Sequence, residues 1–194
     1  MRPPSLLPEG RREPDDSGAV LSLKEGMDTT PNKPARPKTL KRWLKSTSNR
    51  TFGVYPVLIL LFEYLWHGMQ IHWLGWNVPI GVVLLIWGYG QYRLGGNFRE
   101  RTGGGGPGIE IPPDRIVDYG VYAYTRNPMY LGHMIFMFGL AVTFWSWAAL
   151  LLLVGHIFWF QARVKEDEAR LTEMFGAEYT DYTRRVKRWI PYVI

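Results

Sequence analysis

An uncharged segment from Asn127 to Ala162 constrains the fold of this chain more than any other feature. One crossing of a bilayer needs about 20 apolar residues, so this segment is too long for one helix and suits two short ones. We expect a turn at Thr143 to Trp147 between two antiparallel helices. Arg126 and Arg163, which flank the segment, would then return to the same side of the membrane.

The positions of the basic residues indicate the orientation of the chain. All 23 lysines and arginines fall in three blocks, at residues 1–50, 93–126 and 163–188, and the connections at 70–77 and 143–147 contain none. Because basic residues are retained on the cytoplasmic side, we predict four membrane-spanning helices, with both termini and the active site cytoplasmic. Tryptophans would then gather at the outer interface, at Trp66, Trp73, Trp76, Trp145 and Trp147.

The composition supports a membrane location and excludes cysteine chemistry. The net charge of +6 would suit nucleic acid if it formed one basic face, but its separation into blocks between apolar segments favours membrane topology. The aromatic content of 15%, with nine tryptophans, is typical of a bilayer interface. Without cysteine the chain forms no disulfide, thiolate nucleophile or cysteine metal site.

The predicted fold class is an all-α integral membrane protein with a polar N-terminal tail. Residues 1–48 contain too few apolar side chains to fold alone, so we expect a disordered cytoplasmic tail, and no apolar signal-peptide segment follows Arg2. Its run of seven basic residues, from Lys33 to Arg50, is expected to bind anionic lipid, with nucleic acid as the rival interpretation. Residues 49–194 form the membrane domain, with helices at about 51–69, 78–94, 128–144, 146–175 and 177–188 and a loop at 95–125.

The predicted loop contains a run of glycines at 103–108. A glycine run can cradle phosphate, but here no Lys-Ser or Lys-Thr follows and no strand precedes it. A flexible linker is therefore the better interpretation. The segment from Ile109 to Pro113 is extended by its prolines and could lie over the site as a lid.

Two polar clusters flank the uncharged segment. Asn127-Pro128 is typical of a helix start, and such a start directs free N–H groups and a positive dipole end at a bound anion beside Arg126. After the segment, Arg163 and Asp167 lie four residues apart on one helix face, with Glu166 close by. The simplest interpretation of these charges is a solvated helix end joined by salt bridges.

The segment that follows predicts a helix end and a second short helix. Gly176 is expected to end the preceding helix as a C-cap. One apolar-aromatic face of a short helix lying on the membrane is predicted from the spacing of Tyr179, Tyr182, Val186 and Trp189.

A few ionisable residues lie in or near the predicted spans: Glu63, His67, His133 and His156. An ionisable side chain within a membrane is a candidate functional residue. A metal site would require these side chains to converge, so we expect structural hydrogen bonds between helices instead.

The two clusters together form a recognisable pattern. It comprises Arg126-Asn127-Pro128-Met129-Tyr130-Leu131-Gly132, then Asp167-Glu168, Leu171, Phe175-Gly176, Tyr179, Tyr182 and Ile190-Pro191. In this pattern the chain resembles the isoprenylcysteine carboxyl methyltransferase and phospholipid methyltransferase superfamily over about residues 90–194. That family usually has Arg-His-Pro at 126–128 and Glu-Glu at 167–168. Asn127 keeps the hydrogen-bonding character and Asp167 keeps the charge, so we expect the cofactor site to be retained.

The resemblance implies a fold, a cofactor and roles for individual residues. S-adenosylmethionine would bind at the cytoplasmic end of the last two spans, and a lipid-like or prenylated acceptor would enter from the bilayer. The implied cofactor-binding residues are Arg126, Asn127, Tyr130, Gly132, Glu168 at the ribose or amino end, and Tyr122 and Tyr124 as walls. The implied catalytic residues, nearest the acceptor, are Arg163, Asp167 and Glu166.

The sequence leaves the acceptor and two rival functions open. A carboxylate acceptor needs only an arginine such as Arg163 to position it, whereas an ammonium headgroup must first lose a proton to Asp167 or Glu166. One rival is a membrane reductase of the sterol type that uses NADPH, and the other is a non-catalytic membrane protein that binds lipid. Binding of S-adenosylhomocysteine, NADPH or neither distinguishes the three.

Overall fold

The structure is a computed structural model that describes residues 40–67, 75–105 and 111–189. Contacts divide the chain into two units, Met1–Lys38 and Thr39–Ile194, and every described residue belongs to the second. Predictions for residues 1–39, for Trp73 and for Ile190-Pro191 lie outside the described residues. The described part is all-helical and contains no strand, as predicted.

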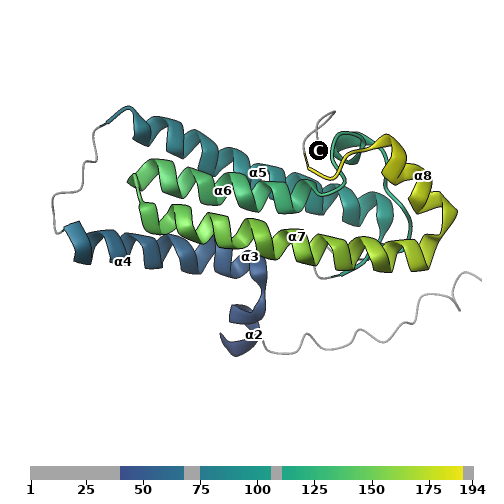
Figure 1. Ribbon diagram of the computed structural model, residues 1–194, viewed down its shortest axis with the longest axis horizontal. Coiled ribbons are helices and arrows are strands. Elements are labelled where there is room, and N and C mark those ends of the chain that lie inside the picture. Colours follow the sequence, from purple (N-terminus) through teal and green to yellow (C-terminus); the bar gives the residue numbers. More distant parts are fainter. Residues whose placement is uncertain (1–39, 68–74, 106–110, 190–194) are drawn as a thin grey trace, which may run out of the picture. The chain divides into compact units, whose positions relative to one another are not determined.

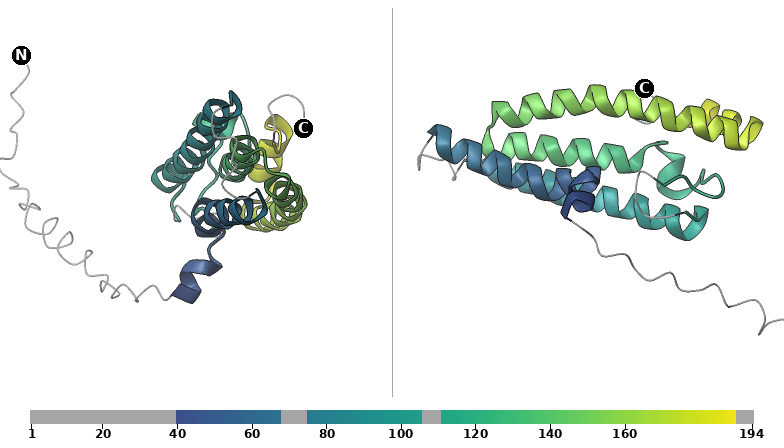
Figure 2. Two further views of the ribbon diagram at one scale, coloured as in Figure 1. Left: turned by 90° about the vertical axis from the view of Figure 1, so that its left-hand side faces the viewer. Right: turned by 90° about the horizontal axis from the view of Figure 1, so that it is seen from below.

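Four helices carry the fold, and they run alongside one another (Figures 1 and 2). Helix α6 contacts α5, α7 and α4. The elements in chain order are α2 (Leu40–Lys45), α3 (Thr47–Asn49), the π-helical segment η1 (Arg50–Val54), α4 (Tyr55–His67), α5 (Asn77–Gly103), the 3-10 turn η2 (Gly120–Ala123), α6 (Pro128–Phe144), α7 (Trp147–Phe175) and α8 (Ala177–Arg185).

Several boundaries differ from the predicted ones. Helices α2 and α3 occupy the end of the predicted tail, and a π-helical segment precedes α4. Helix α5 continues to Gly103 rather than ending at 94, so the loop predicted from 95 begins only after Gly103. At Gly95 a Cβ atom would lie 3.2 Å from Met129 and 3.3 Å from Pro128, so the missing side chain lets α5 continue past the start of α6. Helix α8 ends at Arg185 because Val186 is extended, rather than at 188.

Glycines bring the backbones of α5 and α6 together. A Cβ atom at Gly88 would lie 2.4 Å from the Phe136 nitrogen, and one at Gly132 would lie 2.6 Å from the Tyr92 nitrogen. Gly81 faces Thr143 in the same way, and small residues of this kind let two helices approach closely. Gly90, on the same helix, faces open space instead.

Replacing Gly132 by alanine should destabilise the protein by about 1–3 kcal/mol, because the new methyl group would meet the backbone of α5. The same replacement at Gly90 should leave stability unchanged or slightly higher, since nothing lies within 4 Å and alanine favours a helix. Thermal unfolding in detergent measures both. Equal midpoints for the two variants would contradict the close α5–α6 contact.

The turn between α6 and α7 lies where the sequence predicted it. Trp145 adopts a left-handed conformation with φ 51°, and Ser146 caps α7 by accepting a hydrogen bond of 3.1 Å from the Ala149 nitrogen. The same serine hydroxyl donates to the buried carboxylate of Glu63 on α4. Glu63 therefore joins α4 to the turn, which confirms the expected structural hydrogen bond between helices.

Two histidines of the predicted spans also make hydrogen bonds. His156 on α7 lies 3.1 Å from the Tyr55 hydroxyl on α4, which again joins two helices. His133 bonds the Met129 carbonyl of its own helix at 2.7 Å. His67 ends α4.

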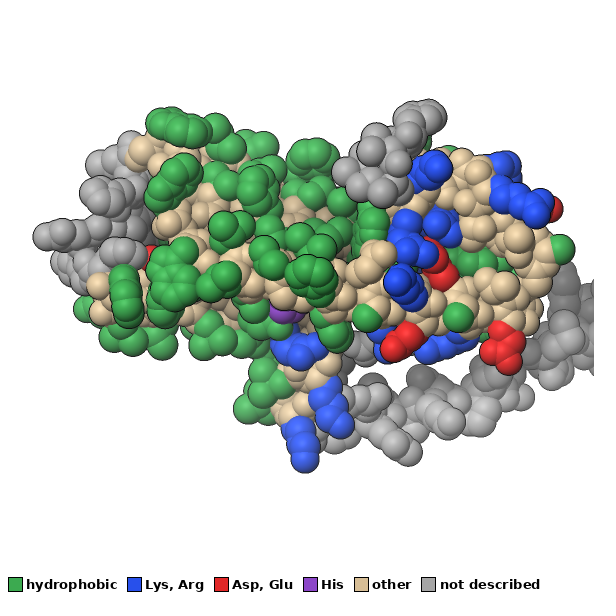
Figure 3. All heavy atoms as spheres, viewed as in Figure 1, with side chains coloured by type: hydrophobic (Ala, Val, Ile, Leu, Met, Phe, Trp, Pro, Cys, Tyr) green, Lys and Arg blue, Asp and Glu red, His purple; other side chains and the backbone are tan. Residues whose placement is uncertain are grey.

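Much of the helical surface is apolar. In Figure 3 hydrophobic side chains cover the helices, and charged side chains gather where α7 meets α8. One described helix, α7, is long and apolar enough to cross a membrane, and α6 is a shorter apolar helix. Tryptophans meet at the end opposite the charges, where the rings of Trp66 and Trp147 lie 6.3 Å apart and those of Trp76 and Trp145 lie 6.4 Å apart.

Candidate functional site

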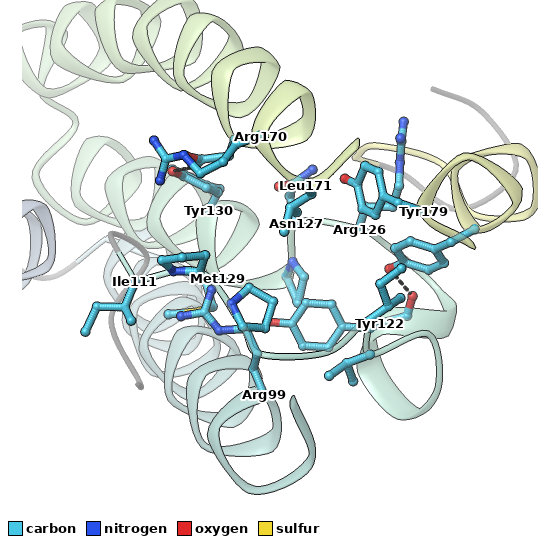
Figure 4. A pocket seen from close by; sticks show the side chains of 17 residues that line it. Arg99, Ile111, Tyr122, Arg126, Asn127, Met129, Tyr130, Arg170, Leu171 and Tyr179 are labelled. Carbon is cyan, nitrogen blue, oxygen red and sulfur yellow. Dashed lines mark hydrogen bonds between the residues drawn. The ribbon is translucent and has the colours of Figure 1, made fainter. Parts of the chain in front are cut away.

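A pocket lies at the charged end of the helices, between α5, α6, α7 and α8 (Figure 4). Its enclosed space is about 90 Å³. Residues remote in sequence line it: Arg99 from α5; Ile111, Pro112, Pro113, Ile116, Val117 and Tyr122 from the following segment; Arg126 to Tyr130 at the start of α6; Asp167, Arg170 and Leu171 from α7; and Tyr179 and Tyr182 from α8.

The start of α6 brings the first motif into this pocket. Pro128 occupies the first turn, where a proline needs no hydrogen-bond acceptor. Asn127 occupies the cap position, but its side chain does not cap the helix. The Asn127 amide donates instead to the Arg188 carbonyl at 3.2 Å, which fixes the entry of the chain into α6.

The second motif meets the first through a tyrosine and a carboxylate. The Tyr130 hydroxyl donates to Asp167 Oδ2 at 2.7 Å, and Arg163 Nε lies 3.6 Å from Asp167 Oδ1. Arg163 also lies 3.8 Å from Glu166, whose side chain is 67% exposed. Asp167 lines the pocket, whereas Arg163 and Glu166 do not. Arg163 therefore does not line the pocket and can influence it through its ion pair with Asp167.

A second carboxylate joins two arginines beside the pocket. Glu168 Oε1 lies 3.3 Å from Arg126 Nη1, and Arg188 donates to both carboxylate oxygens, at 3.1 and 2.5 Å. The exposed fractions of these side chains are 14% for Glu168, 12% for Arg126 and 26% for Arg188. Hydrogen bonding by Glu168 raises the pKa of Arg188. We name Arg126, Glu168 and Arg188 the ion triad.

The segment after α8 returns to the start of α6. The Lys187 carbonyl accepts from the Arg126 nitrogen at 3.1 Å, and the Arg188 carbonyl accepts from the Thr125 hydroxyl at 3.1 Å. Together with the Asn127 amide, these bonds fix residues 187–188 against the first motif.

Helix α8 contributes aromatic walls rather than a face on the membrane. Gly176 separates it from α7 with φ 56°, as predicted for a C-cap. Tyr179, Tyr182 and Val186 are buried together, against Ile116, Leu171 and Phe175. These three side chains therefore pack inside the protein and do not form the apolar face on the membrane that the spacing predicted. Trp189 does not share their face, since its indole donates to Gln161 on α7 at 2.8 Å.

The tyrosine hydroxyls of the pocket are buried and remain protonated. Burial raises the pKa of Tyr122 to about 12 and that of Tyr179 to about 12, and it also raises the pKa of Tyr182. Tyr182 donates to the Tyr122 carbonyl at 2.8 Å, and Tyr122 donates to the Gly95 carbonyl at 3.3 Å. Figure 4 shows the Tyr179 ring beside Arg126.

These shifts predict a loss of stability at high pH. The folded pKa of Tyr122 lies above the unfolded value of 10.0, so its contribution is complete below pH 10 and is lost as the pH rises towards 12. The raised pKa of Tyr179 has the same effect on the pH dependence of stability. The Tyr122→Phe variant should show a weaker decline than wild type when thermal unfolding is measured between pH 8 and 12. A decline of the same slope in both proteins would contradict this assignment.

The structure places some of the predicted site residues in the pocket and others beside it. Tyr122, Arg126, Asn127, Tyr130 and Asp167 line the pocket. Tyr124 is 63% exposed and Gly132 packs against α5, so neither is a wall of the pocket. Glu168 lies in the ion triad, behind Arg126.

Some lining residues were missed by the sequence analysis. Arg170 lies one helical turn after Asp167, a spacing that places both on one helix face, and this signal could have identified it. Arg99 and Arg188 carry no comparable signal, and Tyr179 and Tyr182 were assigned to a helix face on the membrane.

The model of the phospholipid methyltransferase family matches residues 78–178, just over half of the chain. The chain belongs to this family. The match extends from the start of α5 to the start of α8, so it includes the first motif, the part of the second motif from Asp167 to Gly176, and most of the pocket. No described group of His, Asp or Glu side chains forms a metal cluster.

Curated relatives of this phospholipid methyltransferase family member include proteins named protein-S-isoprenylcysteine O-methyltransferase. The protein of Schizosaccharomyces pombe is 32% identical over 80 residues, which cover 40% of this chain and 34% of that protein. The protein of Rattus norvegicus is 27% identical over 130 residues, covering 64% and 43%. The chain thus spans less than half of the length of these relatives.

A solved structure shows the same fold. It is described as the eukaryotic intramembrane Ras methyltransferase, isoprenylcysteine carboxyl methyltransferase, without a monobody. The TM-score is 0.57 at 20% sequence identity, and the match covers 77% of this chain and 54% of that one.

Proposed function

We propose that the protein is an integral membrane methyltransferase that transfers a methyl group from S-adenosylmethionine to the carboxylate of a lipophilic acceptor. The observation that carries this proposal is the pocket itself. The motif at the start of α6 and the motif that begins near the end of α7 line one cavity, and the match to the phospholipid methyltransferase family covers the first motif and the second as far as residue 178.

The proposed topology has four spans, with the pocket and both termini on the cytoplasmic side. The charged end of the helices and the tryptophan end lie opposite each other, which is the arrangement that the positive-inside rule predicts. The acceptor would then reach the pocket from the inner leaflet. The basic run before α4 would contact anionic lipid on that side.

The charged, polar and aromatic groups that line the pocket fit S-adenosylmethionine. The cofactor's carboxylate suits Arg126 and the N-terminus of α6, where the first-turn N–H groups of Met129 and Tyr130 have no acceptor within the helix. Its positive groups suit Asp167, the one carboxylate among the described residues that line the pocket. Tyr122, Tyr179 and Tyr182 supply aromatic surface. When bound, the cofactor supplies a methyl group activated by the sulfonium.

The enclosed space is too small for such a ligand as it stands. Small-molecule sites typically hold about 300–1,000 Å³, whereas the pocket encloses about 90 Å³. Ile111, Pro112 and Pro113 form one wall without belonging to a helix. We propose that this segment moves outward to admit the cofactor and returns to exclude water, as a lid.

The charges of the pocket favour a carboxylate over an ammonium acceptor. An ammonium must lose a proton to a base, but Glu166 lies outside the pocket and the Asp167 carboxylate already accepts from Tyr130 beside Arg163. A carboxylate is already a nucleophile and needs only a cation to position it. Arg170 lines the pocket and can do so. Alignment and exclusion of water then supply most of the rate acceleration.

Cofactor binding tests the proposed function. We expect S-adenosylhomocysteine to bind the detergent-purified protein in calorimetry, and the Arg126→Ala variant not to bind it. NADPH should not bind. Binding of NADPH alone would support a reductase of the sterol type, and binding of neither compound would support a non-catalytic role.

Labelled S-adenosylmethionine tests the acceptor class. An S-prenylated cysteine with a free carboxylate should become labelled, whereas phosphatidylethanolamine should not. The Arg170→Ala variant should raise KM for this acceptor about tenfold or more, because it removes a charge-assisted hydrogen bond. Lys165→Ala, on the exposed face of the same helix, is the matched control. Labelling of the amine alone would overturn the carboxylate assignment.

A further inference from the structure

A groove of about 380 Å³ separates the start of α4 from the middle of α7. It shares no lining residue with the pocket that binds the cofactor in our proposal. Its residues come from η1 and α4 on one side and from α7 on the other: Arg50, Tyr55, Leu151, Leu152, Gly155, His156 and Trp159.

A cation lies at one end of this groove. The Arg50 guanidinium carbon lies 5.8 Å from the centre of the Trp159 ring, and Arg50 Nη2 makes a long hydrogen bond of 3.4 Å to the Thr47 hydroxyl. Arg50 Nε is buried without a hydrogen-bond partner. No described carboxylate forms an ion pair with Arg50, so most of its five N–H donors remain available to an anion.

The other polar groups of the groove satisfy each other. The His156 Nδ1 atom lies 2.9 Å from the Leu152 carbonyl, which only accepts, so Nδ1 carries the proton. In the neutral ring Nε2 then accepts, and the Tyr55 hydroxyl donates to it over 3.1 Å. Arg50 is therefore the one described group of the groove that needs a counter-charge.

The rest of the groove is apolar and open. Leu151 is 61% exposed, and Leu152 forms the wall beside it. Gly155 forms the floor, and a Cβ atom there would have nothing within 4 Å. The groove therefore begins at a cation beside Trp159, near the middle of α7, and continues along hydrocarbon-like surface towards the tryptophan end.

We propose that this groove binds one membrane phospholipid, with its phosphodiester on Arg50 and one acyl chain over Gly155. A guanidinium forms two parallel hydrogen bonds to a phosphate group, which matches the available donors of Arg50. A soluble phosphate would leave the apolar length of the groove empty, whereas a phospholipid fills both parts. The site rests on the membrane location in the proposed function and is independent of methyl transfer.

Two substitutions test the site from its two ends. Gly155→Leu places a side chain in the empty floor, and Arg50→Gln removes the cation. Gly90→Leu is the matched control for the first, because Gly90 also faces open space on a helix surface. Lys165→Gln is the matched control for the second, because Lys165 is an exposed cation of α7 outside the groove.

The measurement is native mass spectrometry of the full chain released from micelles containing phosphatidylglycerol. Wild type and both controls should retain one phospholipid, while Gly155→Leu and Arg50→Gln should weaken its retention about tenfold or more. Millimolar inorganic phosphate should not displace it. All variants should still bind S-adenosylhomocysteine, so a loss of lipid is distinguished from misfolding and from failure of the proposed function.

Other results would overturn the proposal. Equal retention of phosphatidylglycerol by wild type, Gly155→Leu and Arg50→Gln would show that the groove holds no phospholipid. Displacement by inorganic phosphate would show a simple anion site. A Gly155→Leu variant that keeps the phospholipid but has a raised KM for the prenylated acceptor would assign the groove to the acceptor chain.

Discussion

Replacing Glu168 by alanine should lower the free energy of unfolding by about 3–5 kcal/mol. The side chain is mostly buried between Arg126 and Arg188, so its removal leaves two cations facing each other without a counter-charge. Binding of S-adenosylhomocysteine should be lost as well, because Glu168 fixes the guanidinium of Arg126 at the pocket. Thermal unfolding in detergent and calorimetry measure the two effects.

The matched control is Glu166→Ala, two residues earlier on the same helix. Glu166 also pairs with an arginine, at 3.8 Å, but its side chain is 67% exposed. Exposed pairs contribute little, so this variant should unfold within about 0.5 kcal/mol of wild type. If the two variants unfolded at the same midpoint, the ion triad would have no special structural role.

The Asp167→Asn variant should bind S-adenosylmethionine about a hundredfold more weakly than wild type. Asparagine can still accept the Tyr130 hydrogen bond, so the substitution removes mainly the negative charge. If that charge faces the sulfonium, the loss should be much smaller for S-adenosylhomocysteine, whose sulfur is neutral. Competition binding with the two ligands measures the difference.

Tyr130→Phe is the control for this second prediction. It removes the hydroxyl that donates to Asp167 and leaves the carboxylate in the pocket. This variant should weaken the binding of both ligands by similar factors, and these factors should be smaller than the hundredfold loss expected for Asp167→Asn. If Asp167→Asn weakened the binding of both ligands equally, the Asp167 carboxylate would lie near the ammonium group of the cofactor rather than near its sulfonium.

The hairpin was predictable because local and long-range signals agree there. The uncharged segment sets its length, Asn127-Pro128 marks its start and Ser146 caps its second helix. The observed α6 has the predicted bounds, and α7 differs by one residue. The nearness of Arg126 and Glu168, whose side chains lie 3.3 Å apart, follows directly from antiparallel helices, whereas their roles at a cofactor stay predictions.

The rest of the site depends on contacts that no local pattern encodes. A helix end was predicted at residue 94, but close packing of Gly95 against Pro128 and Met129 lets α5 continue to Gly103. Arg99 reaches the pocket on that unpredicted extension. Arg188 was placed on a helix, whereas the chain is extended after Arg185 and turns back to Glu168.

The bonds from residues 187–188 to the start of α6 have a consequence for biosynthesis. Before Arg188 has left the ribosomal exit tunnel, the start of α6 lacks its hydrogen bonds to residues 187–188, and Glu168 lacks one of its two arginines. A nascent chain at that stage would contain the first motif without the bonds that fix it. Competence to hold a ligand should therefore arise only after Arg188 has left the exit tunnel.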